Sequence, residues 1–427
     1  MIYFDNAATS YPKPLEVFES MLKFMQEFGG NPGRAGHRMA TGAEAMIGQA
    51  RNAVSKFFGL NDPARCVFTL NCSDALNMAI KGVLRGGEHV VTTALEHNSI
   101  NRPLQQMADD GFIMLTRVVP SEPGAWHTDE ILAAITPKTR LVALTHCANA
   151  TGVINPVEEL GPALRKKSEG ITLLVDAAQS AGVVPLDMEA AQIDLLAFPG
   201  HKALYGPTGT GALLISSRFD EKRLKLWREG GTGGDSTNPH QPDELPHRLE
   251  GGTPNTMGIA GLLAGVRFLN RIASGRPEAT GGEQLRIADC GLRIGAPSPL
   301  TPLPRGGEGD RSSGQDARTT VLEHERAIVA RLIGELEGDA RFTIFGTKDV
   351  SRKVGALSIT IKDRDNAEVA SILDQAFSIA VRPGLHCAPY AHRQLGTFPN
   401  GTVRLSPGYF NTIEEAEQVV KALKEIA

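Results

Sequence analysis

The residues around Lys202 suggest that its amine takes part in chemistry. It follows an apolar run and precedes a loop rich in glycine and proline, in LLAFPGHKALYGPTGTGAL (195–213). A lysine at the end of a buried strand is costly unless it is paired, neutralised or used covalently. Burial lowers the pKa of such an amine and frees its lone pair for attack on a carbonyl carbon. Lys202 is therefore a candidate nucleophile, although on spacing alone an ordinary solvated loop lysine is favoured.

Two further polar positions follow predicted strands. Asp176 ends the apolar run of LLVDAAQSAG (173–182), where its carboxylate could pair with a cationic ring nitrogen or only cap a helix. Ser73 lies in the polar turn of FTLNCSDALNMAI (68–80). Its hydroxyl and the amides of a helix N-terminus suit a phosphate group, but plain helix capping explains it equally. The segment EGGTPN, with the hydroxyl of Thr253, offers a weaker version of the same pattern.

Cys387 is the cysteine with the setting of a reactive thiolate. It follows His386 in VRPGLHCAPYAH, a segment without helical or strand periodicity. Irregular, partly exposed and electropositive positions favour the thiolate. A packed thiol is the commoner fate of cysteine, but the position and neighbours of Cys387 favour a nucleophile. The other cysteines show neither a disulfide framework nor metal-ligand spacing, so we expect them to be unreactive and expect no metal site: Cys66, Cys72, Cys147 and Cys290.

An α/β sheet is the element expected to position these residues. Short apolar runs alternate with helical patterns from about residue 15 to residue 265. Strands separated by helices of this length predict a mostly parallel sheet covered on both faces. Ligands of such sheets bind at the carboxyl ends of the strands, where the residues above are placed. The expected strands are 66–70, 89–94, 140–147, 172–178, 194–198 and 211–216, with helices over 73–84 and 157–168.

The pattern changes after about residue 320 and predicts a smaller α+β domain. We expect a large domain over 15–265 and a small domain formed by 1–14 and 266–427. Residues 274–317 are rich in proline, glycine and charge, and cannot bury enough apolar surface to offset their ordering entropy. They predict a mobile surface insertion. The expected elements of the small domain are a helix from about 318, strands near 342–346 and 355–362, a helix over 366–376, a strand at 402–405 and a final helix from about 412.

The order of these motifs resembles the class V aminotransferase family, pyridoxal-phosphate (PLP) fold type I, and within it the cysteine desulfurases. Any single motif is weak evidence, but the co-linear set is specific, and only the insertion lies outside it. The matching segments are FDNAAT at 4–9, NPGRAGHR at 31–38, EHNS at 96–99, THCANATG at 145–152, VDAAQ at 175–179, PGHK at 199–202, GGTPN at 251–255, RPGLHCAP at 382–389 and TVRLSPGYFNT at 402–412.

The resemblance implies a fold and a set of roles. The fold is α/β, with a mostly parallel seven-stranded sheet in the large domain and a smaller α+β C-terminal domain. Lys202 would hold PLP covalently and later move the Cα proton, and Asp176 would keep the pyridine nitrogen protonated. Cys387 would take sulfur from L-cysteine as a persulfide and release alanine. Further implied cofactor contacts are Gln179, His97 (also an acid/base group), Ser73, Cys72, His201 and, from a second subunit, Thr253; Asn149, Arg404 and Arg382 would orient the substrate carboxylate.

Two positions depart from the family pattern. Desulfurases with a short catalytic loop, the second group of the family, usually read Arg-x-Gly-His-His-Cys-Ala, and here Leu385 replaces a histidine. Pro199 stands where many relatives place a phosphate-binding serine. Neither change touches the lysine, aspartate or cysteine named above. They place the chain in a divergent branch of the short-loop group, whose substrate could be selenocysteine.

Composition limits the remaining function classes. The chain has 427 residues, a net charge of −4 and a pI of about 6.3, which argues against a nucleic-acid binder. The N-terminus lacks the pattern of a signal peptide, and apolar runs are too short to cross a bilayer, so we expect a cytoplasmic protein without membrane contact. The resemblance implies a homodimer and a protein sulfur acceptor, such as an iron–sulfur assembly protein.

Two alternatives stay open at this point. One is another class V activity, namely selenocysteine lyase, aminotransferase or β-lyase. The other is a catalytically silent PLP-fold protein that serves as a sulfur carrier or scaffold. The joint presence of Lys202, Asp176, His97 and Arg404 argues against the scaffold, because a scaffold needs none of them together.

Overall fold

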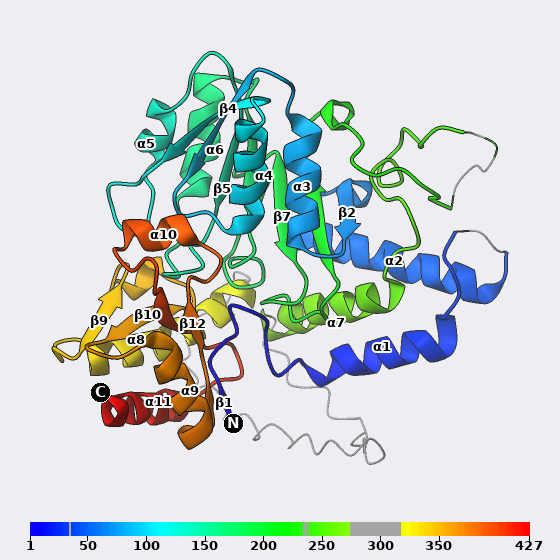
Figure 1. The fold of residues 1–427 in the computed structure, drawn as a ribbon. Helices are drawn as coiled ribbons and strands as arrows, with labels where there is room; N and C mark the ends of the chain where they lie inside the picture. Colours follow the sequence, from blue (N-terminus) through cyan, green and yellow to red (C-terminus); the bar gives the residue numbers. More distant parts are fainter. Residues whose placement is uncertain (34–35, 234–236, 238, 274–316) are drawn as a thin grey trace, which may run out of the picture.

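A seven-stranded sheet forms the centre of the larger part of the molecule (Figure 1). Its strand order is β2-β8-β7-β6-β5-β3-β4, and β8 runs antiparallel to both of its neighbours, whereas the other pairs are parallel. The predicted mostly parallel sheet is therefore confirmed. The strands are β2 Cys66–Thr69, β3 Glu88–Thr93, β4 Ile113–Val118, β5 Thr139–Thr145, β6 Thr172–Asp176, β7 Leu195–Pro199 and β8 Gly211–Ile215.

Helices cover both faces of this sheet because alternate strand residues point to opposite sides. Leu144 and Val175 pack in one apolar core with residues of α2, α6 and α7, while Ala143 and Leu174 pack in a second core with α3 and α4. The helices of this part are α1 Leu15–Phe28, α2 Arg38–Phe57, α3 Cys72–Val83, α4 Asn98–Asp109, α5 Thr128–Ala133, α6 Val157–Lys167 and α7 Thr256–Ala273, with short 3₁₀ helices at Pro63–Arg65 and Glu221–Arg223.

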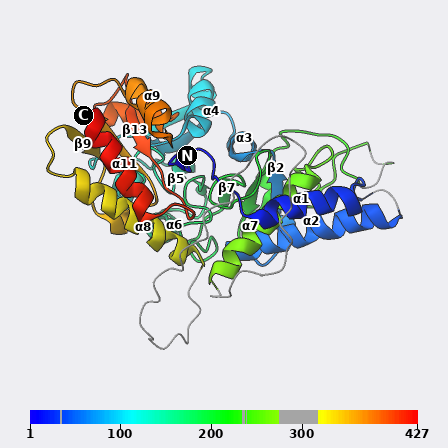
Figure 2. The same ribbon diagram turned by 90° about the horizontal axis from the view of Figure 1, so that it is seen from below.

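The C-terminal part is a four-stranded antiparallel sheet of order β12-β13-β10-β9 with helices packed on it (Figures 1 and 2). The N-terminal strand β1 (Ile2–Tyr3) pairs with β11 of this part, so the chain starts here before it enters the larger part. The elements are α8 Ala317–Leu336, β9 Phe342–Phe345, a 3₁₀ helix at Val350–Arg352, β10 Leu357–Ile361, α9 Asn366–Phe377, β11 Ile379–Ala380, β12 Arg382–Gly384, α10 Pro389–Gln394, β13 Thr402–Leu405 and α11 Ile413–Ile426.

This computed structural model describes residues 1–33, 36–233, 237, 239–273 and 317–427. The predicted insertion over 274–317, including Cys290, lies outside the described residues except for Ala317, which begins α8. The division into domains at 14/15 and 265/266 stays a prediction. Within the described residues, every helix is too short or too polar to span a membrane.

Candidate active site

A pocket of about 210 Å³ opens at the carboxyl ends of β5, β6 and β7. Thr145, Asp176 and Pro199, the last residues of these strands, line it. The structure brings eleven of the twelve predicted site residues to this one pocket. They are Cys72, Ser73, His97, Asn149, Asp176, Gln179, His201, Lys202, Arg382, Cys387 and Arg404.

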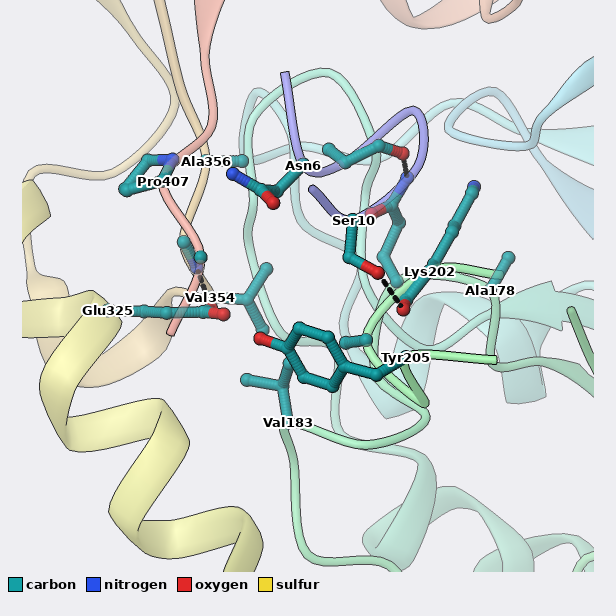
Figure 3. A pocket seen from close by; sticks show the side chains of 15 residues that line it. Asn6, Ser10, Ala178, Val183, Lys202, Tyr205, Glu325, Val354, Ala356 and Pro407 are labelled. Atoms are coloured by element: carbon teal, nitrogen blue, oxygen red, sulfur yellow. Dashed lines mark hydrogen bonds between the residues drawn. The ribbon is translucent and has the colours of Figure 1, made fainter. Parts of the chain in front are cut away.

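Lys202 lies in the loop after β7, and side chains of the N-terminal segment donate hydrogen bonds to the backbone of this loop. Ser10 Oγ donates to the Lys202 carbonyl at 2.8 Å, and Lys13 Nζ donates to the His201 carbonyl at 2.6 Å (the first contact is drawn in Figure 3). Burial lowers the pKa of Lys202, although the nearby charge of Asp176 acts in the opposite direction. Because a lowered pKa raises the share of unprotonated amine at neutral pH, Lys202 can act as a nucleophile.

Asp176 is almost completely buried at the end of β6. Its Oδ1 accepts a hydrogen bond from the Ala178 amide at 2.9 Å and one from Cys72 Sγ at 3.5 Å. Burial and the Asp176 charge raise the pKa of Cys72 well above its ordinary value, so this thiol keeps its proton. Cys72 is therefore a donor to the carboxylate, which fits the prediction that it is no second nucleophile.

The side chains around the start of α3 are suited to an anion. Asn71 caps α3 by accepting from the Asp74 amide at 2.9 Å, which leaves the first amides of the helix beside Ser73. Ser73 Oγ lies 2.6 Å from Ser99 Oγ. His201 has a pKa lowered by burial to about 4, and its buried Nδ1 has no hydrogen-bond partner among the described residues. A buried polar atom of this kind is available to a bound group.

His97 serves as the N-cap of α4, and this role sets its tautomer. Its Nδ1 accepts from the Ser99 amide at 3.1 Å and lies 2.9 Å from Ser99 Oγ. Because an amide can only donate, Nδ1 is unprotonated and a neutral ring carries its proton on Nε2. Burial lowers the pKa of His97, so the neutral form dominates at pH 7.

Arg404 on β13, the candidate residue for binding a substrate carboxylate, is only 2% exposed. Its Nη2 donates to Asp5 Oδ1 at 3.0 Å and its Nη1 to the Asn149 carbonyl at 3.1 Å. The buried Nε has no hydrogen-bond partner among the residues the structure describes. Arg382 stands opposite Arg404 in the β12–β13 pairing, so two guanidinium groups face the pocket from neighbouring strands.

Cys387 is the exposed cysteine among the four described ones, and it lies on the rim of the pocket. The backbone is held on both sides of the thiol. Asn149 Nδ2 donates to the His386 carbonyl at 2.6 Å, and the Asn98 amide donates to the Cys387 carbonyl at 2.8 Å. Asn149 thus contacts the cysteine loop, which the sequence did not predict. Its predicted contact with a substrate carboxylate stays a prediction.

The C-terminal part also holds the segment that carries Asn149. The carbonyl groups of residues 149–151 each accept a hydrogen bond from a side chain of that part, namely Arg404, Ser358 and Lys353 in that order. Lys353 is fully buried, and burial lowers its pKa to about 8. The geometry of the pocket therefore depends on contacts between the two parts of the chain.

Thr253 is the predicted residue that the structure does not bring to the pocket. It is exposed in the segment before α7 and lies outside the pocket lining. The predicted phosphate contact from a second subunit requires such an exposed position but stays a prediction.

Comparison with known proteins identifies the family. The profile of the family described as Aminotransferase class-V matches residues 2–286 and 316–419. The chain belongs to the class-V aminotransferase family.

Relatives of this class-V aminotransferase match along its whole length. Proteins named "Probable cysteine desulfurase" from Methanothermobacter thermautotrophicus and Pyrococcus abyssi are 32% and 31% identical, and each alignment covers 100% of this chain and 94% of the relative. The apo structure of a cysteine desulfurase from Thermococcus onnurineus NA1 superposes with a TM-score of 0.83 at 31% identity, covering 100% of this chain and 94% of that one. The predicted family and fold are therefore confirmed.

The residues of this class-V aminotransferase fit PLP, the cofactor that the family implies. A PLP site needs an amine for covalent attachment, an acid beside a ring nitrogen and donors for a phosphate. Lys202, Asp176 and the partnerless His201 Nδ1 supply these three groups in one pocket. In the described part of the chain, no cluster of three or more His, Cys, Asp or Glu side chains could hold a metal ion.

Several residues in and around the site were not predicted from the sequence. Ser99 stands two residues after His97 in EHNS, and this capping spacing could have indicated it. Asp5 and Lys13 lie in the N-terminal segment, and their partners are 399 and 188 residues away. Asp5 belongs to the quoted segment FDNAAT, but no local pattern indicates its contact with Arg404 or the contact of Lys13 with the His201 carbonyl.

A small cavity of about 30 Å³ lies behind Lys202, between the two parts of the chain. Its volume suits about one or two water molecules. The side chains of Tyr205 and Glu325 line it (Figure 3). Glu325 accepts from the Gly355 amide at 2.9 Å, and burial raises its pKa to about 8. This carboxyl group is therefore mostly protonated in the folded protein at neutral pH.

The raised pKa of Glu325 makes stability dependent on pH. A folded-state pKa near 8 against an ordinary value of 4.5 stabilises the fold fully below pH 4.5, and this stabilisation is lost as the pH rises to 8. The loss is on the order of 5 kcal/mol. We expect Glu325→Gln to become more stable relative to the wild type between pH 5 and pH 8, as measured by urea unfolding. Stability curves that run parallel over this range would contradict the assignment.

Proposed function

We propose that this class-V aminotransferase is a cysteine desulfurase that converts L-cysteine to L-alanine and takes the sulfur on Cys387. The observation that carries the proposal is the exposed Cys387 thiol on the rim of the pocket that also contains Lys202 and Asp176. The full-length relatives named as cysteine desulfurases support the same activity.

We assign two anion-binding sites to the pocket, one for the carboxylate of the substrate and one for the phosphate of the cofactor. Arg404, with its buried and partnerless Nε, and Arg382 would bind the substrate carboxylate. Ser73, the α3 amides and His201 would hold the cofactor phosphate, and Gln179 and Asp176 would bind the ring. When bound, PLP supplies an electron-withdrawing ring that stabilises negative charge on the substrate Cα.

Two residues would move protons in the proposed reaction. Lys202 would hold the cofactor and then, as a free amine of lowered pKa, take the proton from the substrate Cα. His97, neutral and protonated on Nε2, would exchange a proton with the substrate inside the pocket. Burial disfavours the charged form of both groups, so it favours the uncharged forms that these proton transfers need.

Cys387 would carry out the sulfur transfer. Its Sγ forms a bond to the substrate sulfur while the Cβ–S bond breaks, and the electron pair of that bond stays on Cβ, which takes up a proton. L-Cysteine and the Cys387 thiol thus become L-alanine and a Cys387 persulfide, with no external oxidant or reductant. Because Cys387 is exposed, the persulfide can pass its sulfur to the thiol of an acceptor protein.

We propose that the enzyme works as a cytoplasmic homodimer, with Thr253 of each subunit completing the phosphate site of the other. The exposed position of Thr253 outside its own pocket supports this arrangement. The large domain over 15–265 and the small domain over 1–14 and 266–427 would together enclose the substrate.

One incubation tests the activity. PLP-loaded protein is mixed with L-cysteine, and alanine, sulfide and protein-bound persulfide are measured. We expect one alanine per sulfur released and persulfide on the Cys387 peptide. Cys387→Ser should lose persulfide and slow alanine formation by roughly 10²-fold or more, because the sulfur then lacks its acceptor.

The other outcomes separate the alternatives. Pyruvate or a keto acid in place of alanine would sink the desulfurase proposal in favour of a β-lyase or aminotransferase. Turnover of L-selenocysteine that greatly exceeds turnover of L-cysteine, and survives in Cys387→Ser, would indicate a selenocysteine lyase. Undiminished persulfide formation in Cys387→Ser would remove Cys387 from its role.

A further inference from the structure

The Cys387 backbone adopts a conformation that needs external support. His386 and Cys387 have consecutive positive φ angles of 49° and 58°. A left-handed conformation is unfavourable for a non-glycine residue, so two in a row persist only where neighbouring groups enforce them. The hydrogen bonds from Asn149 and the Asn98 amide hold the two carbonyl groups of this turn. The His386 side chain is held by separate hydrogen bonds of its ring nitrogens.

A chain of buried hydrogen bonds holds that side chain. His386 Nε2 lies 3.0 Å from the Arg382 carbonyl, and His386 Nδ1 lies 3.2 Å from His392 Nε2. His392 Nδ1 in turn lies 2.7 Å from Thr397 Oγ1. His386 is 4% exposed and His392 is fully buried. The chain therefore connects β12, the cysteine turn, α10 and the segment after α10.

With both rings neutral, the partner at one end, the Arg382 carbonyl, fixes the direction of every bond, and the Thr397 hydroxyl at the other end donates to His392 Nδ1 at 2.7 Å rather than to the His392 carbonyl at 3.3 Å. The Arg382 carbonyl can only accept, so His386 carries a proton on Nε2. The Nδ1 of neutral His386 must then accept, so His392 donates from Nε2 and its own Nδ1 accepts from the Thr397 hydroxyl. Burial, with Arg404 nearby, lowers the pKa of His386 to about 3 and that of His392 to about 4, so both rings are neutral at pH 7. One proton arrangement thus satisfies all three bonds.

We propose that His392 is a positioning residue for Cys387: with Thr397 as donor, it fixes the His386 ring and so holds the strained turn that keeps the thiol at the pocket. This inference rests on the proposed function only in giving Cys387 the role of sulfur nucleophile. Without these hydrogen bonds between His386, His392 and Thr397, we expect the turn to relax toward solvent and carry the thiol away from the substrate.

Matched variants separate this role from simple packing. Thr397→Val removes the hydroxyl at almost constant shape, whereas Thr397→Ser keeps it. His392→Leu removes both ring nitrogens. His89→Leu is the control, because His89 is also buried and bridges the hydroxyl groups of Thr139 and Thr116 at 2.8 Å each, outside the pocket lining.

The first measurement is the alkylation rate of Cys387 by iodoacetamide at pH 7 in cofactor-free protein, read from the Cys387 peptide by mass spectrometry. We expect His392→Leu and Thr397→Val to raise this rate at least about fivefold, since relaxation of the turn moves the already exposed thiol away from the neighbouring walls of the pocket and lowers the steric barrier to the reagent. Thr397→Ser and His89→Leu should stay within about twofold of the wild type. The second measurement is persulfide formation, which should fall about tenfold in kcat for the same two variants with little change in KM for L-cysteine.

Ring ¹⁵N chemical shifts of histidine-labelled protein test the proton arrangement directly. We expect both rings in the Nε2-protonated form, and an Nδ1-protonated His392 would overturn the proposed chain. Alkylation and persulfide rates of Thr397→Val within twofold of Thr397→Ser would also overturn it, even if His392→Leu fails to fold. If wild-type protein forms no persulfide, the proposed function fails, while the alkylation comparison still decides the role of His392.

Discussion

Lys202→Ala should reduce alanine formation from L-cysteine by roughly 10³-fold or more, because it would remove both the proposed attachment point of PLP and the amine proposed to move the Cα proton. The proposed phosphate contacts are made by other residues of the pocket, Ser73 and His201, which the substitution leaves in place. The variant should therefore still bind PLP, but release it on desalting, whereas the wild type retains it. Visible absorbance before and after desalting measures this difference.

Lys13 offers the matched control for Lys202. Burial lowers its pKa to about 7, so it is a second amine of lowered pKa near the same loop. Its Nζ, however, already donates to Ser10 Oγ and to the His201 carbonyl. Borohydride reduction and peptide mapping should place the pyridoxyl label on Lys202, and Lys13→Met should keep retained cofactor and activity within about fivefold. A label on Lys13 would refute the assignment.

The central strands could be predicted from the sequence because both of their faces are buried. Strands β5 to β7 read as continuous apolar runs for this reason, and their predicted limits agree with the structure to within two residues. Strand β4 was missed. It lies at the edge of the sheet with mostly half-buried side chains, so its pattern carries less of the apolar signal.

The candidate site was predictable where each residue follows a strand or belongs to a recognised motif. Lys202 and Asp176 could be placed because parallel strands bring their carboxyl ends to one edge of the sheet. The support of the site could not be predicted in this way. The contacts of Lys353 with the Thr151 carbonyl and of Asn149 with the His386 carbonyl join residues more than 200 positions apart. Such contacts depend on how the two parts of the chain pack.

Arg404 is the second residue whose replacement should have a large effect. Its guanidinium group already donates to Asp5 and the Asn149 carbonyl, and the partnerless Nε is one of the N–H donors left for a substrate carboxylate. The single ammonium of Arg404→Lys cannot serve three acceptors in this fixed geometry. We expect KM for L-cysteine to rise by roughly 10²-fold, since a hydrogen bond to a charged group contributes about 1.5–3 kcal/mol.

A structural loss must be separated from a loss of carboxylate binding, because Arg404 also joins the two parts of the chain. Cysteamine, which is L-cysteine without its carboxylate, makes this separation. Wild-type protein should prefer L-cysteine over cysteamine strongly as a ligand, whereas Arg404→Lys should lose most of this preference and keep only the part that Arg382 supplies. Asp5→Asn is the matched control, since it weakens the support of Arg404 but keeps the guanidinium group in place. It should lower the free energy of unfolding by about 1–3 kcal/mol and largely keep the preference for L-cysteine. If Arg404→Lys retains the wild-type preference, then the carboxylate binds elsewhere, and the role of Arg404 is to hold Asn149 and Asp5.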